Sequence, residues 1–458
     1  MLNSKVTNIK NIRKEVIPYM LCWIFYYTWI LVFFTWWIND FDNSYIFKSK
    51  ELFTIYTLFL IIINVIIFLV HPKNFKKYYV FGGISSLIFL IFYYFINTYF
   101  NLIYILPVFM AFSFIGLLQM FIYIMNNSER FFSLLIGNFF LILLVLLQDI
   151  KVINTTNNYL FLILLLFLSI LPTIKTKSER YYEEEKKFKK TAPKISKLLY
   201  LSVIINCIFL TFCRGVGRAF LLIANDMYPF NLEIYYYLGA LFGCIILYAL
   251  FNHVKRCNII SWNMIFALFV LSSFLYMWPS SLFVKNLFAF ILGISLMMGI
   301  NSMYYILGVI SKKYWDFKFS RFNILVIGLL GCGFGTFLGN YIYKYGSDNF
   351  NNIILTISVI MVIVLLILSP ILENTFFRDK WDEDSTKATI DNLNKRKYSK
   401  YNLTLKEMEV CNYIIENNSV RQISISMGIS ENTVKFHKKQ IFKKLNISSK
   451  DELISLLK

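Results

Sequence analysis

Twelve apolar runs, each roughly 20 residues long, fill most of the chain up to residue 372. An α-helix of about 20 apolar residues spans the hydrocarbon core of a bilayer. Within that core only helices and closed barrels satisfy their backbone hydrogen bonds, so runs of this length favour a bundle of membrane-spanning helices. The predicted spans are residues 17–38, 52–70, 78–100, 102–125, 131–147, 159–174, 198–223, 234–251, 259–277, 287–310, 322–345 and 353–372.

The composition argues against a string of soluble domains. Of the 458 residues, 58% are hydrophobic and only 16% are charged, whereas a soluble domain has roughly 25% charged residues. The seven cysteines show no CxxC spacing, so we expect neither a disulfide nor a metal site. The first 16 residues are polar and further spans follow the first one, a pattern that argues against a cleaved signal peptide.

The basic residues predict how the spans are oriented. With the N-terminus inside the cell, 25 Lys and Arg residues fall on the inner side and five on the outer side. Lys and Arg in short loops stay cytoplasmic, which favours this orientation over its inverse. An even number of spans then returns the C-terminus to the cytoplasm. We therefore expect a multi-pass membrane protein with both termini cytoplasmic.

One long charged loop, residues 175–197, divides the spans six plus six. A twelve-span bundle split in this way resembles the major facilitator superfamily, and the resemblance covers about residues 15–372. The loop at residues 71–77 lacks the Gly and Asp of that family's usual motif. The spans hold no Asp or Glu at their centres, whereas proton-coupled transport usually needs such a carboxylate or a His relay. These departures favour a transporter-like fold that binds a molecule without pumping it.

Two arginines are the charged side chains that lie well inside a span. Arg214 and Arg218 are four positions apart in the seventh span and therefore share one face of a helix. A charge at membrane depth normally faces a cavity or a partner. Two interpretations stay open. The arginines bind an anionic group of a ligand, or they are structural, pairing with Asp149 or Asp226 or, for Arg218, reaching the outer headgroups.

The family resemblance implies that the first, fourth, seventh and tenth spans line a central cavity. An apolar cavity with a few polar groups suits a small aromatic or amphipathic ligand. The candidate ligand-binding residues are Arg214, Arg218, Tyr26, Tyr27, Gln119 and Asn301. The expected ligand is an unidentified small molecule with aromatic and anionic parts. Plain helix packing is the alternative role for the tyrosines, since this chain is 19% aromatic.

The composition changes after residue 372. Residues 373–402 mix acidic, basic, Asn and Ser residues without a helical apolar stripe, so we expect a polar linker. Residues 403–458 then show the signals of four helices, each starting near a residue that can cap it. The predicted capping residues are Thr404, Ser419, Ser430 and Ser449. In the third helix, residues 431–445, an apolar stripe faces the core and lysines occupy the other side.

Residues 403–458 are similar to the LuxR-type DNA-binding domain. The residues that carry this resemblance are Leu403, Thr404, Glu407, Glu409, Val410, Ile423, Gly428, Ile429, Ser430, Thr433, Val434, Lys435, His437, Ile441, Lys444, Leu445, Ile447 and Ser449. Gln422, Ser424 and Lys450 differ from the residues usual in that family. The spacing is consistent over the whole segment, so the departures affect packing detail and not the assignment.

The resemblance implies which side chains read DNA. Lys435, Phe436 and Lys439 would enter the major groove, where Lys donates to guanine and an aromatic ring touches a thymine methyl. The flanking contacts, mainly to phosphate, fall to Ser430, Asn432, Thr433, Lys438, Lys443 and Lys444. A plain solvated face is the alternative for these lysines. Such domains read paired half-sites, so the expected partners are double-stranded DNA and a second copy of the chain.

A DNA reader fixed to a lipid bilayer couples an event at the membrane to transcription. We therefore expect an all-α one-component regulator of the bacterial cell (plasma) membrane, whose twelve spans sense a small molecule. The alternative is a major-facilitator-type secondary transporter with an attached DNA-binding regulatory head. The sequence shows no nucleotide-binding loop, metal cluster or catalytic triad, so we expect neither an enzyme nor a cofactor. The expected domains are a cytoplasmic segment (1–16), the membrane sensor (17–372, halves 17–174 and 198–372), the linker (373–402) and the DNA-binding domain (403–458).

Overall fold

The computed structural model describes most of the chain. The described residues are 9–39, 46–70, 75–96, 100–149, 158–175, 232–253, 257–278, 281–314, 349–372, 403–415, 419–427, 430–449 and 452–453, with isolated positions within 201–224 and 338–344. Every element that these residues form is a helix. The chain divides into two compact units, unit 1 (Met1–Asp379) and unit 2 (Lys380–Lys458).

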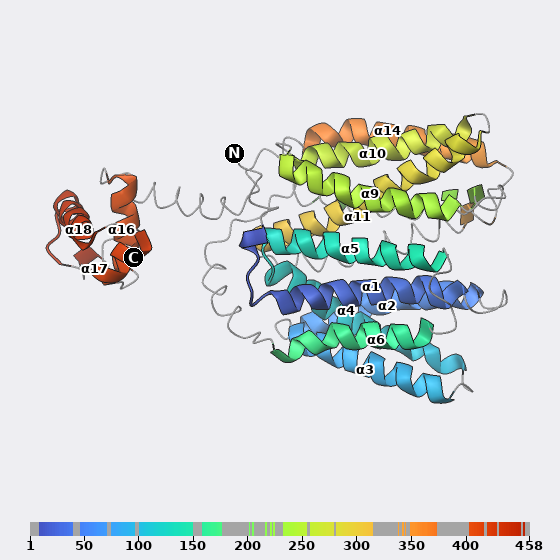
Figure 1. Ribbon diagram of the computed structural model, residues 1–458, viewed down its shortest axis with the longest axis horizontal. Coiled ribbons are helices and arrows are strands. Elements are labelled where there is room, and N and C mark those ends of the chain that lie inside the picture. The colour runs from blue at the N-terminus through green and yellow to red at the C-terminus, as the bar shows by residue number, and fades with distance from the viewer. Residues whose placement is uncertain are drawn as a thin grey trace. The chain divides into compact units, whose positions relative to one another are not determined.

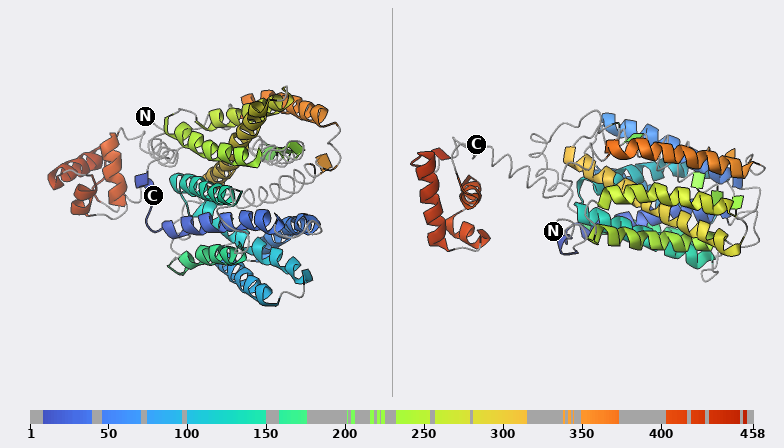
Figure 2. Two further views of the ribbon diagram at one scale, coloured as in Figure 1. Left: turned by 45° about the vertical axis from the view of Figure 1, so that its right-hand side comes forward. Right: turned by 90° about the horizontal axis from the view of Figure 1, so that it is seen from above.

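Unit 1 is a bundle of long helices that run along a common direction (Figure 1 and Figure 2). Its first part contains α1 (Ile17–Asn39), α2 (Ile46–Val70), α3 (Phe75–Ile96), α4 (Leu106–Tyr123), α5 (Asn127–Asp149) and α6 (Asn158–Ile170). Its second part contains α9 (Leu232–His253), α10 (Cys257–Met277), α11 (Leu282–Tyr314) and α14 (Phe350–Leu372). Short 3-10 helices are η1 (Ile9–Asn11), η3 (Phe100–Ile105) and η5 (Leu171–Lys175). These helices coincide with ten predicted spans; the other two, 198–223 and 322–345, fall largely outside the described residues.

Seven helices are long and apolar enough to cross a membrane, counting only the described residues. They contain the segments Ile17–Phe34, Phe75–Tyr93, Ile103–Tyr123, Asn127–Leu147, Leu232–His253, Ile260–Met277 and Leu282–Ser311. Shorter apolar helices lie at Ile55–Ile67, Leu160–Thr173 and Asn351–Val364. Large apolar side chains such as Phe92, Phe242 and Leu366 are exposed on these helices. An apolar surface of this extent fits lipid and not water, so unit 1 is a membrane domain.

The packing of the first part recurs in the second part. α2 and α3 both pack against α4, and α3 also packs against α6. Six predicted spans later, α9 and α10 both pack against α11, and α10 also packs against α14. The same set of neighbours therefore appears twice, as an internal repeat produces.

Glycines let helices approach closely within each part. A Cβ added to Gly239 of α9 would overlap the carbonyl group of Phe290 in α11, and one added to Gly293 of α11 would overlap the carbonyl of Tyr236. Gly116 of α4 lies in the same way against the backbone of α3. A larger residue at these crossings would push a backbone away, so small residues are needed there.

The two parts of unit 1 meet along α5, which packs against α9 and α11 as well as against α1 (Figure 1). Ile142 of α5 belongs to a buried cluster with Cys244 of α9 and Met297 of α11. Nearer the start of α5, the ring of Phe131 lies 4.8 Å from the ring of Phe251 in α9. This contact between the parts contains the buried polar residues described below.

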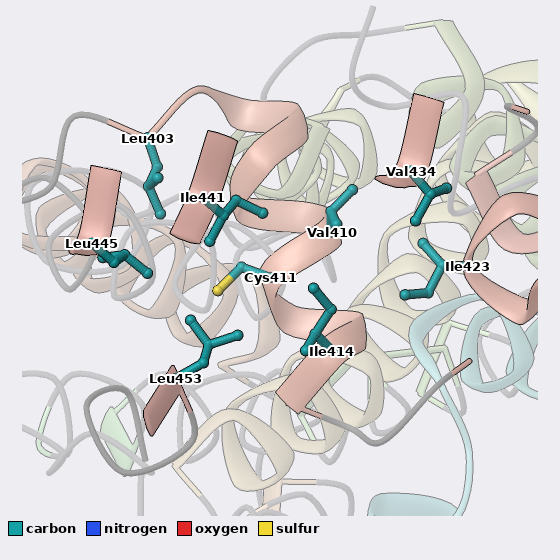
Figure 3. Packing of buried hydrophobic residues seen from close by; sticks show 9 residues of the cluster. All are labelled: Leu403, Val410, Cys411, Ile414, Ile423, Val434, Ile441, Leu445 and Leu453. Carbon is teal, nitrogen blue, oxygen red and sulfur yellow. The ribbon is translucent and has the colours of Figure 1, made fainter. Parts of the chain in front are cut away.

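Unit 2 contains α16 (Leu405–Ile415), α17 (Val420–Met427) and α18 (Glu431–Leu445), packed around one core (Figure 3). The buried residues of this core are Leu403, Val410, Cys411, Ile414, Ile423, Val434, Ile441, Leu445 and Leu453. Three of the four residues in the predicted stripe of α18 are buried, whereas His437 is only half-buried. The fully buried Val410 is central to the core, although the sequence analysis gave it no core position.

Reciprocal caps begin the first two helices of unit 2. The backbone N–H of Thr404 donates to the Glu407 carboxylate at 2.7 Å, and the Glu407 N–H donates to the Thr404 hydroxyl at 3.4 Å. Ser419 and Gln422 make the same exchange at 2.8 and 3.3 Å. The departure from the family pattern at Gln422 therefore preserves a capping box.

Candidate nucleic-acid interface

The start of α18 combines a capped helix end with accessible polar side chains. The Ser430 hydroxyl accepts the N–H of Thr433 at 3.2 Å and lies 2.8 Å from the Thr433 hydroxyl. Ser430 and Asn432 are exposed, and Thr433 is partly exposed. The N-terminus of a helix attracts anions through its backbone N–H groups and its dipole. This end of α18 is therefore suited to a phosphate contact.

One face of α18 carries two lysines around an exposed aromatic ring. Lys435, Phe436 and Lys439 are all exposed. Phe436 is 58% exposed, although the other large apolar side chains described in unit 2 are buried or partly buried. A ring left in water between lysines contributes little to the core. Its exposure, with the two charges beside it, suits contact with a partner that offers both apolar and anionic groups.

The remaining lysines of α18 differ in what they contact. The Nζ of Lys438 lies 5.4 Å from the centre of the Phe442 ring. Lys443 is exposed in the last turn. The Nζ of Lys444 lies 2.7 Å from the carboxylate of Glu407 in α16. Lys444 therefore ties α18 to α16 in addition to any contact that it makes with phosphate.

The Glu407 carboxylate connects the cap of α16 to the helix that carries the lysines. Burial alone would raise the pKa of Glu407, but the hydrogen bonds that it accepts from Lys444 and Thr404 outweigh burial and hold its pKa below the usual value. At neutral pH the charged carboxylate holds both partners. The sequence analysis identified the cap but missed the second role, because Lys444 lies 37 positions further along the chain.

A comparison with protein families identifies this arrangement. The family model described as bacterial regulatory proteins, luxR family, matches residues 401–457. Residues 401–457 are a LuxR-type helix-turn-helix domain. Within the LuxR-type domain, α17 and α18 form the helix-turn-helix, so the exposed face of α18 belongs to a DNA-binding helix. No match was found among curated proteins.

Unit 1 is similar in fold to a transporter. A solved structure of a variant of the E. coli fucose:proton symporter FucP matches with a TM-score of 0.53 and 12% identity, covering 80% of this chain and 100% of that chain. At this identity the likeness shows the fold alone. The chain therefore joins a major-facilitator-like membrane domain to a LuxR-type domain, which confirms the predicted all-α class and both family resemblances. This combination suggests a regulator and not an enzyme.

The two tyrosines predicted to bind a ligand are buried and face different neighbours. The Tyr26 hydroxyl donates to the carbonyl of Met110 in α4 at 3.0 Å. The Tyr27 ring stacks on Trp23 with centroids 5.6 Å apart and meets the ring of Tyr304 in α11 edge-on at 6.0 Å. Tyr26 therefore links helices of the first part, whereas Tyr27 faces the second part.

The other candidate ligand-binding residues differ in position. Arg214 and Arg218 lie outside the described residues. Gln119 is buried, and its Oε1 has no hydrogen-bond partner in the part of the chain that the structure describes. Asn301 of α11 is buried and accepts a hydrogen bond from Asn138 of α5 at 2.8 Å. Within the described ranges, no three His, Cys, Asp or Glu side chains gather as metal ligands.

Sequence analysis placed Arg130 in a short loop, but it is fully buried at the start of α5. Its guanidinium donates to three backbone carbonyl oxygens at and just beyond the end of α4, at 2.7–3.2 Å. Such bonds satisfy carbonyls that a helix end leaves without an intrahelical partner. A Cβ added to Gly308 of α11 would lie 2.6 Å from the Arg130 Cδ, so this side chain also touches the second part.

The neighbouring Glu129 fastens the N-terminal segment. Its carboxylate accepts hydrogen bonds from Nε and Nη2 of Arg13 at 3.0 and 2.9 Å, and from the Arg13 backbone N–H at 2.9 Å. Asn126 adds a bond from its Nδ2 to the carbonyl of Asn11 at 3.0 Å. A bidentate Arg–carboxylate pair is a strong, directional contact. It fixes the segment before α1 to the connection between α4 and α5.

Proposed function

We propose that the chain is a membrane-embedded one-component transcriptional regulator. Unit 1 senses a small molecule, and the LuxR-type domain binds promoter DNA as a homodimer. One observation carries the proposal: a single chain joins a LuxR-type domain to a major-facilitator-like membrane domain. Signal and DNA contact are then covalently linked and need no diffusing partner.

The DNA contacts follow from the exposed side of α18. Lys435, Phe436 and Lys439 read base edges in the major groove, while the remaining contacts position the domain on the backbone. The positioning residues are Ser430, Asn432, Thr433, Lys438, Lys443 and Lys444. The exposure of the first three and the capped helix start at Ser430 support this division.

The proposal needs the LuxR-type domain on the cytoplasmic side. We propose a multi-pass protein of the bacterial cell membrane with both termini and residues 175–197 in the cytoplasm, as the distribution of Lys and Arg favours. Reporter fusions at Asn43 and at Asn349 should then read as external. A cytoplasmic signal from both positions would contradict the twelve-span arrangement.

The sensing site is proposed between the first, fourth, seventh and tenth predicted spans. Arg214 would hold an anionic end of the ligand, with Tyr26 or Tyr27 against its body. Further groups would come from Arg218, Gln119 and Asn301. The approach of Tyr27 to Tyr304 supports this location, because α1 and α11 meet there. A ligand shifts the regulator only if it binds one arrangement of the two parts better than the other.

Replacing the proposed anchor tests the sensing mechanism. Arg214→Gln should abolish the transcriptional response to a compound that induces the parent protein, while membrane insertion and DNA binding stay unchanged. Lys151→Gln, a charge loss in a predicted outer loop, is the matched control and should respond normally. A normal response of Arg214→Gln at the same inducer concentration would exclude Arg214 as the anchor. Accumulation of the inducer that an uncoupler abolishes would favour the secondary transporter instead.

A further inference from the structure

A hydrogen bond between two amide side chains joins the two parts of unit 1 inside the bundle. Nδ2 of Asn138 in α5 donates to Oδ1 of Asn301 in α11 at 2.8 Å. Asn138 is fully buried and Asn301 is 1% exposed. Because water does not reach either amide in this arrangement, the bond exists only while the two parts stay in contact.

Both amides keep a second partner on their own helix. Nδ2 of Asn138 also donates to the Leu134 carbonyl at 3.0 Å, and Nδ2 of Asn301 donates to the Met297 carbonyl at 3.1 Å. When α5 and α11 separate, each nitrogen retains this bond, and Oδ1 of Asn301 is the atom that loses its donor. Breaking the contact therefore leaves fewer unsatisfied groups than parting two amides that bond only to each other. The bond holds the parts together and is readily released.

Apolar contacts lie on both sides of this amide bond. The Sγ of Cys244 in α9, which is 1% exposed, lies 3.9 Å from Nδ2 of Asn301. Ile142, one turn further along α5, packs in the same cluster as Cys244. In the other direction along α5, Phe131 packs against Phe251. The amide pair is thus a polar contact within the main junction between the two parts.

We propose that the Asn138–Asn301 bond is a latch that holds the two parts in the arrangement described here, and that its release is the signal passed to the LuxR-type domain. The second half of this inference rests on the proposed function, in which unit 1 controls that domain. Two packed parts that rock about their junction supply two discrete states. One interhelical hydrogen bond in a membrane shifts such an equilibrium by about threefold, and by up to roughly twentyfold. A ligand with modest differential affinity can overcome a shift of this size.

The Cys244 thiol reports whether the junction is closed. In native membranes containing the full chain, its reaction with N-ethylmaleimide can be followed by peptide mass spectrometry, beside a transcriptional reporter. Asn138→Leu removes the latch and leaves the Asn301 contact with Cys244 in place. It should speed Cys244 labelling by about three- to twentyfold and shift reporter output without inducer. Asn301→Leu should act alike, and the double variant should exceed neither, because one bond is broken in all three.

Two further variants keep the test decisive. Asn138→Ser can bond within α5 but is too short to reach α11, so it should show the same shift even if the Leu variants fail to insert. Ser272→Ala removes a buried hydroxyl whose bond to Phe269 stays within α10, and it should change neither readout. Unchanged Cys244 labelling in the inserted Asn variants would overturn the latch. Faster labelling with an unchanged reporter would retain the latch and overturn the proposed control of transcription.

Discussion

The LuxR-type domain and the membrane domain use polar side chains in different ways. In the LuxR-type domain, Thr404, Ser419 and Ser430 stand at helix starts and accept N–H groups of the first turn. In the membrane domain, hydroxyls such as those of Ser133 and Ser272 bond back to carbonyl oxygens of their own helix. Water can replace a missing partner at the surface but not inside a bilayer. Polarity therefore marks where helices begin in one unit and is hidden within helices in the other.

A substitution at a helix crossing of the membrane domain should have the largest effect. In Gly239→Val the new side chain would overlap the Phe290 carbonyl, so α9 and α11 must separate. We expect a loss of about 3 kcal/mol, enough to leave little folded protein. In Gly137→Ala the added Cβ would meet its nearest atom, in Ile24, at 3.6 Å, so stability should hardly change. Thermal unfolding in detergent checks both, and equal melting temperatures would contradict the close crossing.

Removing a lysine from the exposed face of α18 should have the next largest effect. In the fragment Lys380–Lys458, Lys435→Ala or Lys439→Ala should each cost about 1–3 kcal/mol of operator binding and relax sequence preference. Lys443→Ala should weaken all sequences alike and lower the salt slope by about one unit. Anisotropy titrations with a site selected from random DNA, and with scrambled DNA, separate these outcomes. An intact operator preference in Lys435→Ala would mean that this face does not read bases.

Hydroxyl deletions compare the two units directly. Ser430→Ala removes the N-cap of α18 and should destabilise the LuxR-type domain by about 1 kcal/mol in urea unfolding. Ser272→Ala removes a bond that stays within one helix and should change the membrane domain by less than about 0.5 kcal/mol in thermal unfolding. Similar losses in both units would remove the contrast between them.

Acid should produce the smallest effect, and only in the LuxR-type domain. The pKa of Glu407 is lowered on folding, so its stabilisation is fully present above the unfolded pKa of about 4.3 and is lost as the pH falls through the lower folded pKa. Because Lys444 is partly exposed, we expect less than about 1 kcal/mol. Urea unfolding at several pH values should show this loss, and Glu407→Gln should reduce it. The same acid dependence in Glu407→Gln would assign the effect to other carboxylates.

Local signals made most of the LuxR-type domain predictable from the sequence. The predicted third helix, 431–445, matches α18 (Glu431–Leu445), because a cap at Ser430 depends on residues three positions apart. The exposed lysine face follows from helical periodicity for the same reason. The pairing of Lys444 with Glu407 could not be predicted, since it depends on how α16 and α18 pack.

In the membrane domain the sequence located helices but not their contacts. Apolar runs mark helices well because a span must satisfy its backbone internally and reach across the bilayer. Asn138 and Asn301 are 163 positions apart, and nothing local distinguishes them from polar residues that bond only within a helix. Arg130 was misplaced for a related reason: it lies at a helix start, where a loop residue and a buried one have the same neighbours in sequence.

The ion pair between Arg13 and Glu129 bears on how the chain is made. The two residues are 116 positions apart, and ribosomes add about 5–20 residues per second. After Arg13 leaves the ribosome, its partner therefore follows roughly 6–23 s later. The first helix enters the bilayer with its leading segment unsecured, and the arrival of the fifth helix fastens it. The start of this protein thus reaches its final position only after a quarter of the chain has been synthesised.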